Sequence, residues 1–238
     1  MIVSHQHRFI FMKTRKTAGT SVEVFLSSIA GDDAIVTPFG VAEGIDHAPR
    51  NWQRLFNPLS ETIGPMRYRS RGIRGRGWSR TAKDLLHRRA FEEHLTARLA
   101  IARLGRRTWR DYFTFCFERD PWDKTLSWYW WSTRNLSHRP PLAEWIMTAQ
   151  LPSDWSTYAI GDDLAVDFVG RYESLEEDLA LALRTLGIDV PVELPRAKAQ
   201  HRPSSGEETF EPSAHRRIAE VFAREIKAFG YEDRSVAC

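Results

Sequence analysis

The sequence predicts an α/β fold with three layers, in which helices flank a central, mostly parallel sheet. Short apolar runs alternate with segments of helical spacing along most of the chain, and glycines or prolines separate them. Such alternation favours a parallel sheet covered by helices on both faces. At 238 residues and 42% hydrophobic content, the chain is expected to form one domain, residues 1–238.

The expected elements follow in order along the chain. Strands are expected at 8–12, 34–37, 112–117 and just after 166, and helices at 21–30, 91–105, from 122 onward, 174–186 and 212–229. Glycines end or directly follow four of these helices, as helix ends favour: Gly31, Gly105, Gly187 and Gly230. Asp120 before Pro121 is typical of a helix start, because an acid caps the first turn and proline fits its first position. Ser174, with Glu177 three residues later, predicts a capping box.

The turn between the first strand and the first helix is predicted to cradle a phosphate. It contains Lys16, Gly19, Thr20 and Ser21. Unpaired backbone N–H groups and the helix dipole favour an anion at a helix start, and a lysine adds full positive charge. Gly19 would let the backbone approach the phosphate closely, and the two hydroxyls can cap the helix or donate to the anion.

This loop differs from the Walker A loop of nucleoside triphosphatases. That loop requires a lysine directly after its last glycine. Here Lys16 comes three residues before Gly19, and no other segment supplies the Walker pattern. The order of residues therefore disfavours a nucleotide kinase, which stays as an alternative function.

A second motif follows the strand expected at 112–117. Arg119 comes at the carboxyl end of that strand, and Ser127 lies about two turns into the next helix. Both can face the crevice in which open α/β sheets bind ligands. An arginine fork matches a dianionic phosphate, and a serine hydroxyl adds a donor.

The two motifs, in this order, resemble those of sulfotransferases that use 3′-phosphoadenosine 5′-phosphosulfate (PAPS). The similarity covers most of the chain, including the strand and helix at 167–179, and points to bacterial sulfotransferases related to enzymes that sulfate glycan hydroxyls. It implies a P-loop-like fold, PAPS as donor without a metal, and release of 3′-phosphoadenosine 5′-phosphate (PAP). The donor-binding residues that it implies are Arg15, Lys16, Thr17, Ala18, Gly19, Thr20, Ser21, Arg119, Ser127 and Arg202.

The expected reaction needs a group that stabilises the leaving oxygen and a base for the acceptor. Lys16 at the 5′-phosphosulfate can neutralise the developing charge. In the glycan 2-O-sulfotransferases that the chain resembles, a histidine at the start of the helix before the Arg-Asp-Pro strand is the base, and His94 occupies the matching place. His47 is the alternative base, and Glu92 and Glu93 leave a glutamate base open. The acceptor is expected to be a hydroxyl, or secondarily an amine, of a carbohydrate or a small metabolite.

Composition limits the remaining functions. Cys116 and Cys238 form neither a disulfide framework nor a metal spacing, and Cys116 is expected to be a buried apolar residue. No segment approaches the ~20 apolar residues of a membrane span, and no signal peptide is recognisable, so a cytoplasmic protein without a membrane partner is expected. The oligomeric state is left open.

Arginines and glycines are concentrated at 64–80, which is interpreted as a mobile basic insert. Such a segment can be a solvated loop, can close over an anionic ligand, or can bind nucleic acid. A nucleic-acid-binding protein acting through this insert is the third functional hypothesis, and the two motifs disfavour it.

Overall fold

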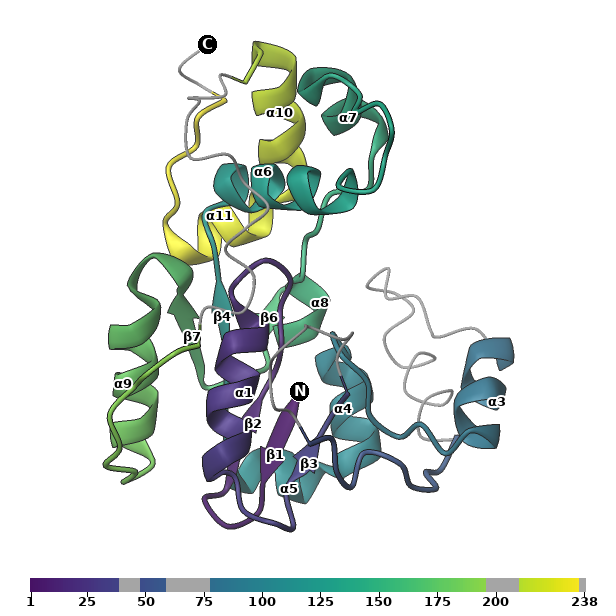
Figure 1. The fold of residues 1–238 in the computed structure, drawn as a ribbon, viewed down its shortest axis with the longest axis vertical. Coiled ribbons are helices and arrows are strands. Elements are labelled where there is room, and N and C mark those ends of the chain that lie inside the picture. Colours follow the sequence, from purple (N-terminus) through teal and green to yellow (C-terminus); the bar gives the residue numbers. More distant parts are fainter. Residues whose placement is uncertain (39–47, 59–77, 196–209, 236–238) are drawn as a thin grey trace.

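The computed structural model describes residues 1–38, 48–58, 78–195 and 210–235. Within these residues the protein has an α/β fold around a five-stranded mixed sheet of order β3-β1-β2-β4-β7 (Figure 1). The predicted α/β class is thus confirmed. The strands are β1 (Ile2–Ser4), β2 (Phe9–Phe11), β3 (Ile35–Val36), β4 (Phe113–Glu118) and β7 (Phe168–Arg171).

The parallel part of the sheet is limited to β2, β4 and β7. Strand β1, which sequence reasoning missed, is antiparallel to both β2 and β3. Only residues 5–8 connect β1 to β2, whereas a parallel connection needs a dozen residues or more. The hairpin therefore makes the sheet mixed rather than mostly parallel.

Side chains of β2 and β4 alternate between two apolar clusters, one on each face of the sheet. Phe9, Phe11, Phe115 and Phe117 pack with residues of α1 (Gly19–Ile29) and α9 (Leu175–Thr185). Ile10, Met12 and Cys116 pack on the opposite face with residues of α4 (Ala97–Leu104), α5 (Arg106–Asp111) and α8 (Trp155–Tyr158). Cys116 is fully buried, as predicted.

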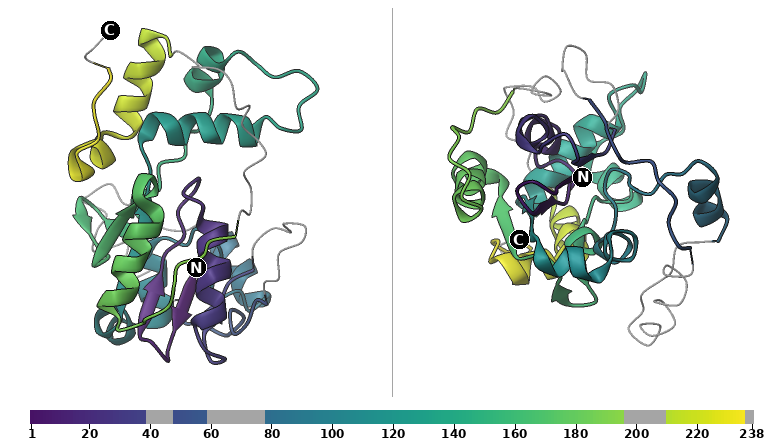
Figure 2. Two further views of the ribbon diagram at one scale, coloured as in Figure 1. Left: turned by 60° about the vertical axis from the view of Figure 1, so that its left-hand side comes forward. Right: turned by 90° about the horizontal axis from the view of Figure 1, so that it is seen from below.

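Four helices form a further group beyond one end of the sheet (Figure 2). They are α6 (Pro121–Ser132), α7 (Leu142–Thr148), α10 (Pro212–Val221) and α11 (Ala223–Phe229). Trp122 of α6 is fully buried against Ile146 of α7 and Ile218 of α10. Helix α6 therefore belongs both to this group and, through its first turn, to the end of β4.

The remaining described elements are α3 (Trp78–Leu86), the hairpin β5 (Ala159–Ile160) and β6 (Asp163–Leu164), and the short 3₁₀ helix η2 (Tyr172–Ser174). Helix α3 includes the last three residues of the predicted basic insert at 64–80, and the rest of the insert lies outside the described residues. No helix in the described ranges is both long and apolar enough to cross a bilayer.

Three local predictions were wrong. The helix expected from residue 91 begins at Ala97, because Thr96 caps it by accepting a hydrogen bond from the Leu99 N–H. The helix expected over 212–229 is two helices, because Phe222 (φ −103°, ψ 20°) departs from helical geometry. Ser174 is the N-cap residue of α9, but its hydroxyl contacts the Asp178 carboxylate at 3.1 Å instead of completing a capping box with Glu177.

Candidate functional site

A cavity of about 890 Å³ opens where the parallel strands β2, β4 and β7 end. Segments 13–21, 119–131 and 172–177 line it, and each begins after the carboxyl end of one of these strands. Residues 93–94 and 194–195 complete the lining. Open α/β sheets bind ligands at this edge because the loops that follow parallel strands meet there.

The loop between β2 and α1 has an unusual backbone conformation. Lys16 (φ 62°) and Ala18 (φ 54°) are both left-handed, although neither is glycine. Such residues persist only where their surroundings hold them, and they are concentrated at ligand sites. Ala18 is the N-cap of α1 and makes no side-chain cap, so Thr20 and Ser21 lie in the first helical turn, where both line the cavity.

Gly19 is required by contacts within the protein. A Cβ at this position would come within 2.8 Å of the Lys13 Cγ atom and 3.3 Å of the Thr14 carbonyl oxygen. Lys13 itself is buried, and its ammonium group pairs with Glu23 at 2.5 Å and with Glu93 at 3.5 Å. The missing Cβ of Gly19 therefore makes room for Lys13, whereas the sequence predicted that it would make room for a phosphate.

Arg119 connects the second motif to the loop. Its Nη1 atom donates to the Lys16 carbonyl at 2.9 Å, and its Nε atom donates to Asp123 at 2.8 Å. A further bond joins its Nη2 atom to the same carboxylate, and the guanidinium carbon lies 3.9 Å from the centroid of the Tyr172 ring. These bonds engage three of the five N–H donors of Arg119.

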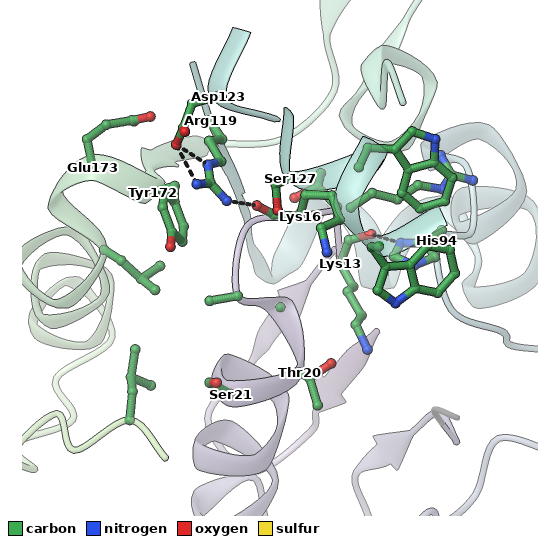
Figure 3. A pocket seen from close by; sticks show the side chains of 18 of the residues that line it. Lys13, Lys16, Thr20, Ser21, His94, Arg119, Asp123, Ser127, Tyr172 and Glu173 are labelled. Carbon is green, nitrogen blue, oxygen red and sulfur yellow. Dashed lines mark hydrogen bonds and ion pairs between the residues drawn. The ribbon is translucent and has the colours of Figure 1, made fainter. Parts of the chain in front are cut away.

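One face of α6 turns toward the cavity. Asp123, Ser127 and Trp131 follow at intervals of four residues, and all three line it. The Lys16 ammonium group lies 5.7 Å from the centroid of the Trp131 ring. In Figure 3, Lys16 and Ser127 lie between Arg119 on one side and His94 on the other.

His94 lies in a turn ahead of α4, with a left-handed backbone (φ 54°). Its Nδ1 atom donates to the Lys13 carbonyl at 3.0 Å, so the Nε2 atom of the neutral ring bears the lone pair. Burial lowers the pKa of His94; the Asp154 charge opposes this shift, and the Arg15 and Lys13 charges add to it. His94 is therefore neutral at neutral pH, as a base requires.

Nine of the predicted site residues line this single cavity: Arg15, Lys16, Ala18, Gly19, Thr20, Ser21, His94, Arg119 and Ser127. Thr17 does not, because its buried hydroxyl bonds the Thr14 hydroxyl at 2.9 Å. His47 and Arg202 lie outside the described residues. Of the two candidate glutamates, Glu93 lines the cavity and Glu92 does not.

Sequence reasoning missed Lys13 and Asp154. Lys13 directly follows the predicted strand, so its position was a usable signal. Asp154 is buried and binds Arg15 through two hydrogen bonds of 2.7 Å, one from the backbone N–H and one from the guanidinium group. It belongs to no motif and lies 139 residues from its partner, so only the structure reveals it.

No three His, Cys, Asp or Glu side chains are grouped as metal ligands in the described parts of the chain. No family model matches the chain, and no solved structure matches it. The chain is 37% identical over 92 residues to an uncharacterized protein of Archaeoglobus fulgidus, a match that covers 36% of this chain and 77% of the archaeal protein. The chain belongs to the family of that protein, whose name states no activity.

Proposed function

We propose that this protein is a sulfotransferase, which moves a sulfuryl group from PAPS to an acceptor hydroxyl and releases PAP. One observation carries the proposal: Lys16, Arg119 and His94, from three separate segments, line one cavity at the carboxyl edge of the sheet. An anion-binding loop, a second phosphate-binding group and a neutral base are the parts that this reaction needs.

The residues present fit the two anionic ends of PAPS. Lys16, the start of α1 and the hydroxyls of Thr20 and Ser21 suit the 5′-phosphosulfate. Arg119, with N–H donors beyond those bound to Asp123 and Lys16, and Ser127 suit the 3′-phosphate. The strand–loop–helix unit of β2 and α1 beside β4 and β7 supports a P-loop-like, three-layer fold.

In the proposed reaction, PAPS supplies the sulfuryl group. The acceptor oxygen bonds to sulfur as the bond from sulfur to the 5′-phosphate oxygen breaks. Lys16 neutralises charge that develops on that phosphate oxygen. The Nε2 atom of His94 accepts the acceptor's proton, while the Lys13 carbonyl holds the ring through Nδ1.

The acceptor is proposed to be a carbohydrate or a small metabolite. Trp128 and Trp131 stack with their centroids 4.7 Å apart and an interplanar angle of 17°, and both line the cavity. Because Lys16 lies beside Trp131, this pair forms an apolar wall near the expected position of the sulfuryl group. Such a wall suits the flat face of an uncharged ring.

Ligand binding and transfer test the proposal together. PAP should raise the melting temperature, since a ligand at 100 times its Kd stabilises the native state by about 2.7 kcal/mol. Labelled PAPS with a panel of hydroxylated acceptors should then yield a sulfated product without added metal. Stabilisation by ATP and magnesium but not by PAP, with transfer that stops on chelation, would replace this function by phosphotransfer. Salt-sensitive binding to random oligonucleotides alone would favour the nucleic-acid alternative.

A further inference from the structure

A chain of buried charges lies beneath the cavity. The carboxylate of Asp154 accepts the two hydrogen bonds from Arg15 and pairs with the Lys124 ammonium group at 3.0 Å. Lys124 in turn donates to Glu118 at 2.6 Å. The side chains of Asp154, Lys124 and Glu118 are at most 1% exposed.

The two ends of this chain lie next to the two donor-binding residues of the proposed function. At one end, the backbone N–H of Arg15, which precedes Lys16, is bound to Asp154. At the other end, the backbone N–H of Arg119 donates to Glu118 at 2.9 Å. Three charged side chains thus connect the backbone beside Lys16 to the backbone of Arg119.

We propose that Asp154 is a positioning residue that, through Lys124 and Glu118, holds the Lys16 loop in place relative to Arg119. The effect expected on turnover rests on the proposed function, whereas the effect on the loop does not. The carboxylate of Asp154 binds Arg15, which lines the cavity, and Lys124, which does not. Its proposed effect on Lys16 and Arg119 is therefore indirect.

The energetics favour a rigid arrangement. Burial disfavours the charged forms of Asp154 and Lys124. The attraction between the two groups outweighs this effect: Lys124 and Arg15 lower the pKa of Asp154, and Asp154 and Glu118 raise the pKa of Lys124. Both therefore stay ionised at neutral pH. Removing Lys124 would leave two buried carboxylates without their ammonium partner, which is strongly unfavourable, whereas Lys124 still pairs with Glu118 when Asp154 is removed. A network of this kind can hold the left-handed conformation of Lys16, which the loop alone would not favour.

Asp154 also acts on the proposed base. The charged groups around His94 are Asp154, Arg15, Lys13 and Glu93. Of these, Asp154 raises the pKa of His94 against the effect of burial, while Arg15 and Lys13 lower it. Loss of the Asp154 charge should therefore lower the pKa of His94 further.

Asp154→Asn tests the proposal, because it removes the charge and keeps the size of the side chain. We expect the amide hydrogen of Arg15 to exchange about tenfold faster or more, since its charged acceptor is gone. At saturating PAPS, turnover should fall by about 10- to 100-fold, the range expected when reacting groups are misplaced by a fraction of an ångström to an ångström. PAP affinity is less informative, because a looser loop weakens binding while the lost negative charge strengthens it.

Asp84→Asn is the matched control. It breaks another buried pair, in which Asp84 lies 3.2 Å from Arg103, and neither residue lines the cavity. This variant should melt at a lower temperature but keep the Arg15 exchange rate and the turnover within about twofold of wild type. Should the single variant fail to fold, the triple variant Asp154→Asn/Lys124→Met/Glu118→Gln removes all three buried charges together, so that none is left without a partner.

The outcomes separate the two proposals. If the wild-type protein transfers no sulfuryl group, the proposed function fails, and the Arg15 exchange rate together with the pKa of His94 from NMR titration still decides the role of Asp154. If both quantities match wild type in Asp154→Asn or in the triple variant, Asp154 is only a structural residue and the inference is overturned.

Discussion

Lys16 and Arg119 are joined directly, because the Arg119 guanidinium group donates to the Lys16 carbonyl. The two residues are nevertheless expected to act at different stages of the reaction. The Lys16 ammonium group lies beside the Trp131 ring, where charge develops in the proposed transfer. The Arg119 guanidinium group is held by Asp123 and lies over the Tyr172 ring. There it is proposed to bind the 3′-phosphate, which takes no part in the bond changes of the reaction.

Lys16→Ala should lower turnover far more than it lowers affinity for PAP. The reason is that charge on the leaving oxygen develops only in the transition state. Turnover at saturating PAPS and the Kd for PAP provide the comparison. Lys227→Ala, which removes an exposed lysine of α11, is the control and should change neither. Turnover near wild type in a folded Lys16→Ala protein would exclude the leaving-group role.

Arg119→Ala should weaken binding of PAP by about 10- to 100-fold, as expected for a lost charged hydrogen bond of 1.5–3 kcal/mol. Adenosine 5′-phosphate, which lacks the 3′-phosphate, should lose much less affinity. Titration calorimetry with both ligands makes the test. Arg119→Lys should restore only part of the affinity, since an ammonium group lacks the fork. Equal losses for both ligands would mean that Arg119 does not bind the 3′-phosphate.

Turnover should rise with pH through the pKa of His94, because only the neutral ring accepts the acceptor's proton. Burial places this pKa below the ordinary value near 6.5, so the midpoint of the rise should lie below pH 6.5. His94→Ala should keep the fold and PAP binding while losing roughly 10²–10⁴-fold in turnover. An active but less stable His94→Ala protein would transfer the base role to His47 or to Glu93, of which Glu93 lines the same cavity.

The start of α6 and the ends of α9 and α11 were predictable because local chemistry determines them. Asp120 caps α6 by accepting from the N–H groups of Trp122 and Asp123, with Pro121 in the first turn, as the sequence predicts. Gly187 and Gly230 are left-handed at the ends of α9 and α11. These features depend on a few neighbouring residues, so a single segment of sequence contains them.

Features that depend on distant partners escaped prediction. Strand β1 is only three residues long and is defined by its pairing with β2 and β3. Asp154 acquires its role only when the fold brings it to Arg15. For the same reason the motif residues that line the cavity could be identified from the sequence, whereas their hydrogen-bond partners could not.

At the start of α1, Gly19→Ala should destabilise the protein by about 1–3 kcal/mol, the usual cost of overpacking. The added methyl group would press on the Lys13 side chain and the Thr14 carbonyl. Chemical denaturation measures the effect. Ser28→Ala, at an exposed position near the other end of the same helix, should stay within about 0.5 kcal/mol of wild type. No loss in Gly19→Ala would mean that the loop adjusts freely.

For the whole molecule, the free energy of unfolding should fall as the pH falls below about 6.5. The pKa of His94 is lower in the folded protein than in the unfolded chain. As the pH falls, the unfolded chain therefore binds a proton at His94 before the folded protein does, which stabilises the unfolded state relative to the folded one. Asp154 also has a lowered pKa, held down by Lys124 and Arg15 against burial, and its contribution is lost at still lower pH, below about 3.9. Urea denaturation at a series of pH values measures both stages. His94→Gln should reduce the first stage, to which His215 also contributes because burial lowers its pKa, and should leave the second stage. An unchanged first stage would contradict the assignment to His94.

The pairing of β2 with β4 has a consequence for how the protein acquires its cavity during folding. Lys16 and Arg119 follow these two strands, 103 positions apart in the chain. Contacts between such distant segments form slowly, because a long loop must close before they add any stability. The helices can therefore form early, while the cavity exists only after the central strands have met. In a refolding experiment, PAP binding should appear with the slowest phase, well after most of the helical signal.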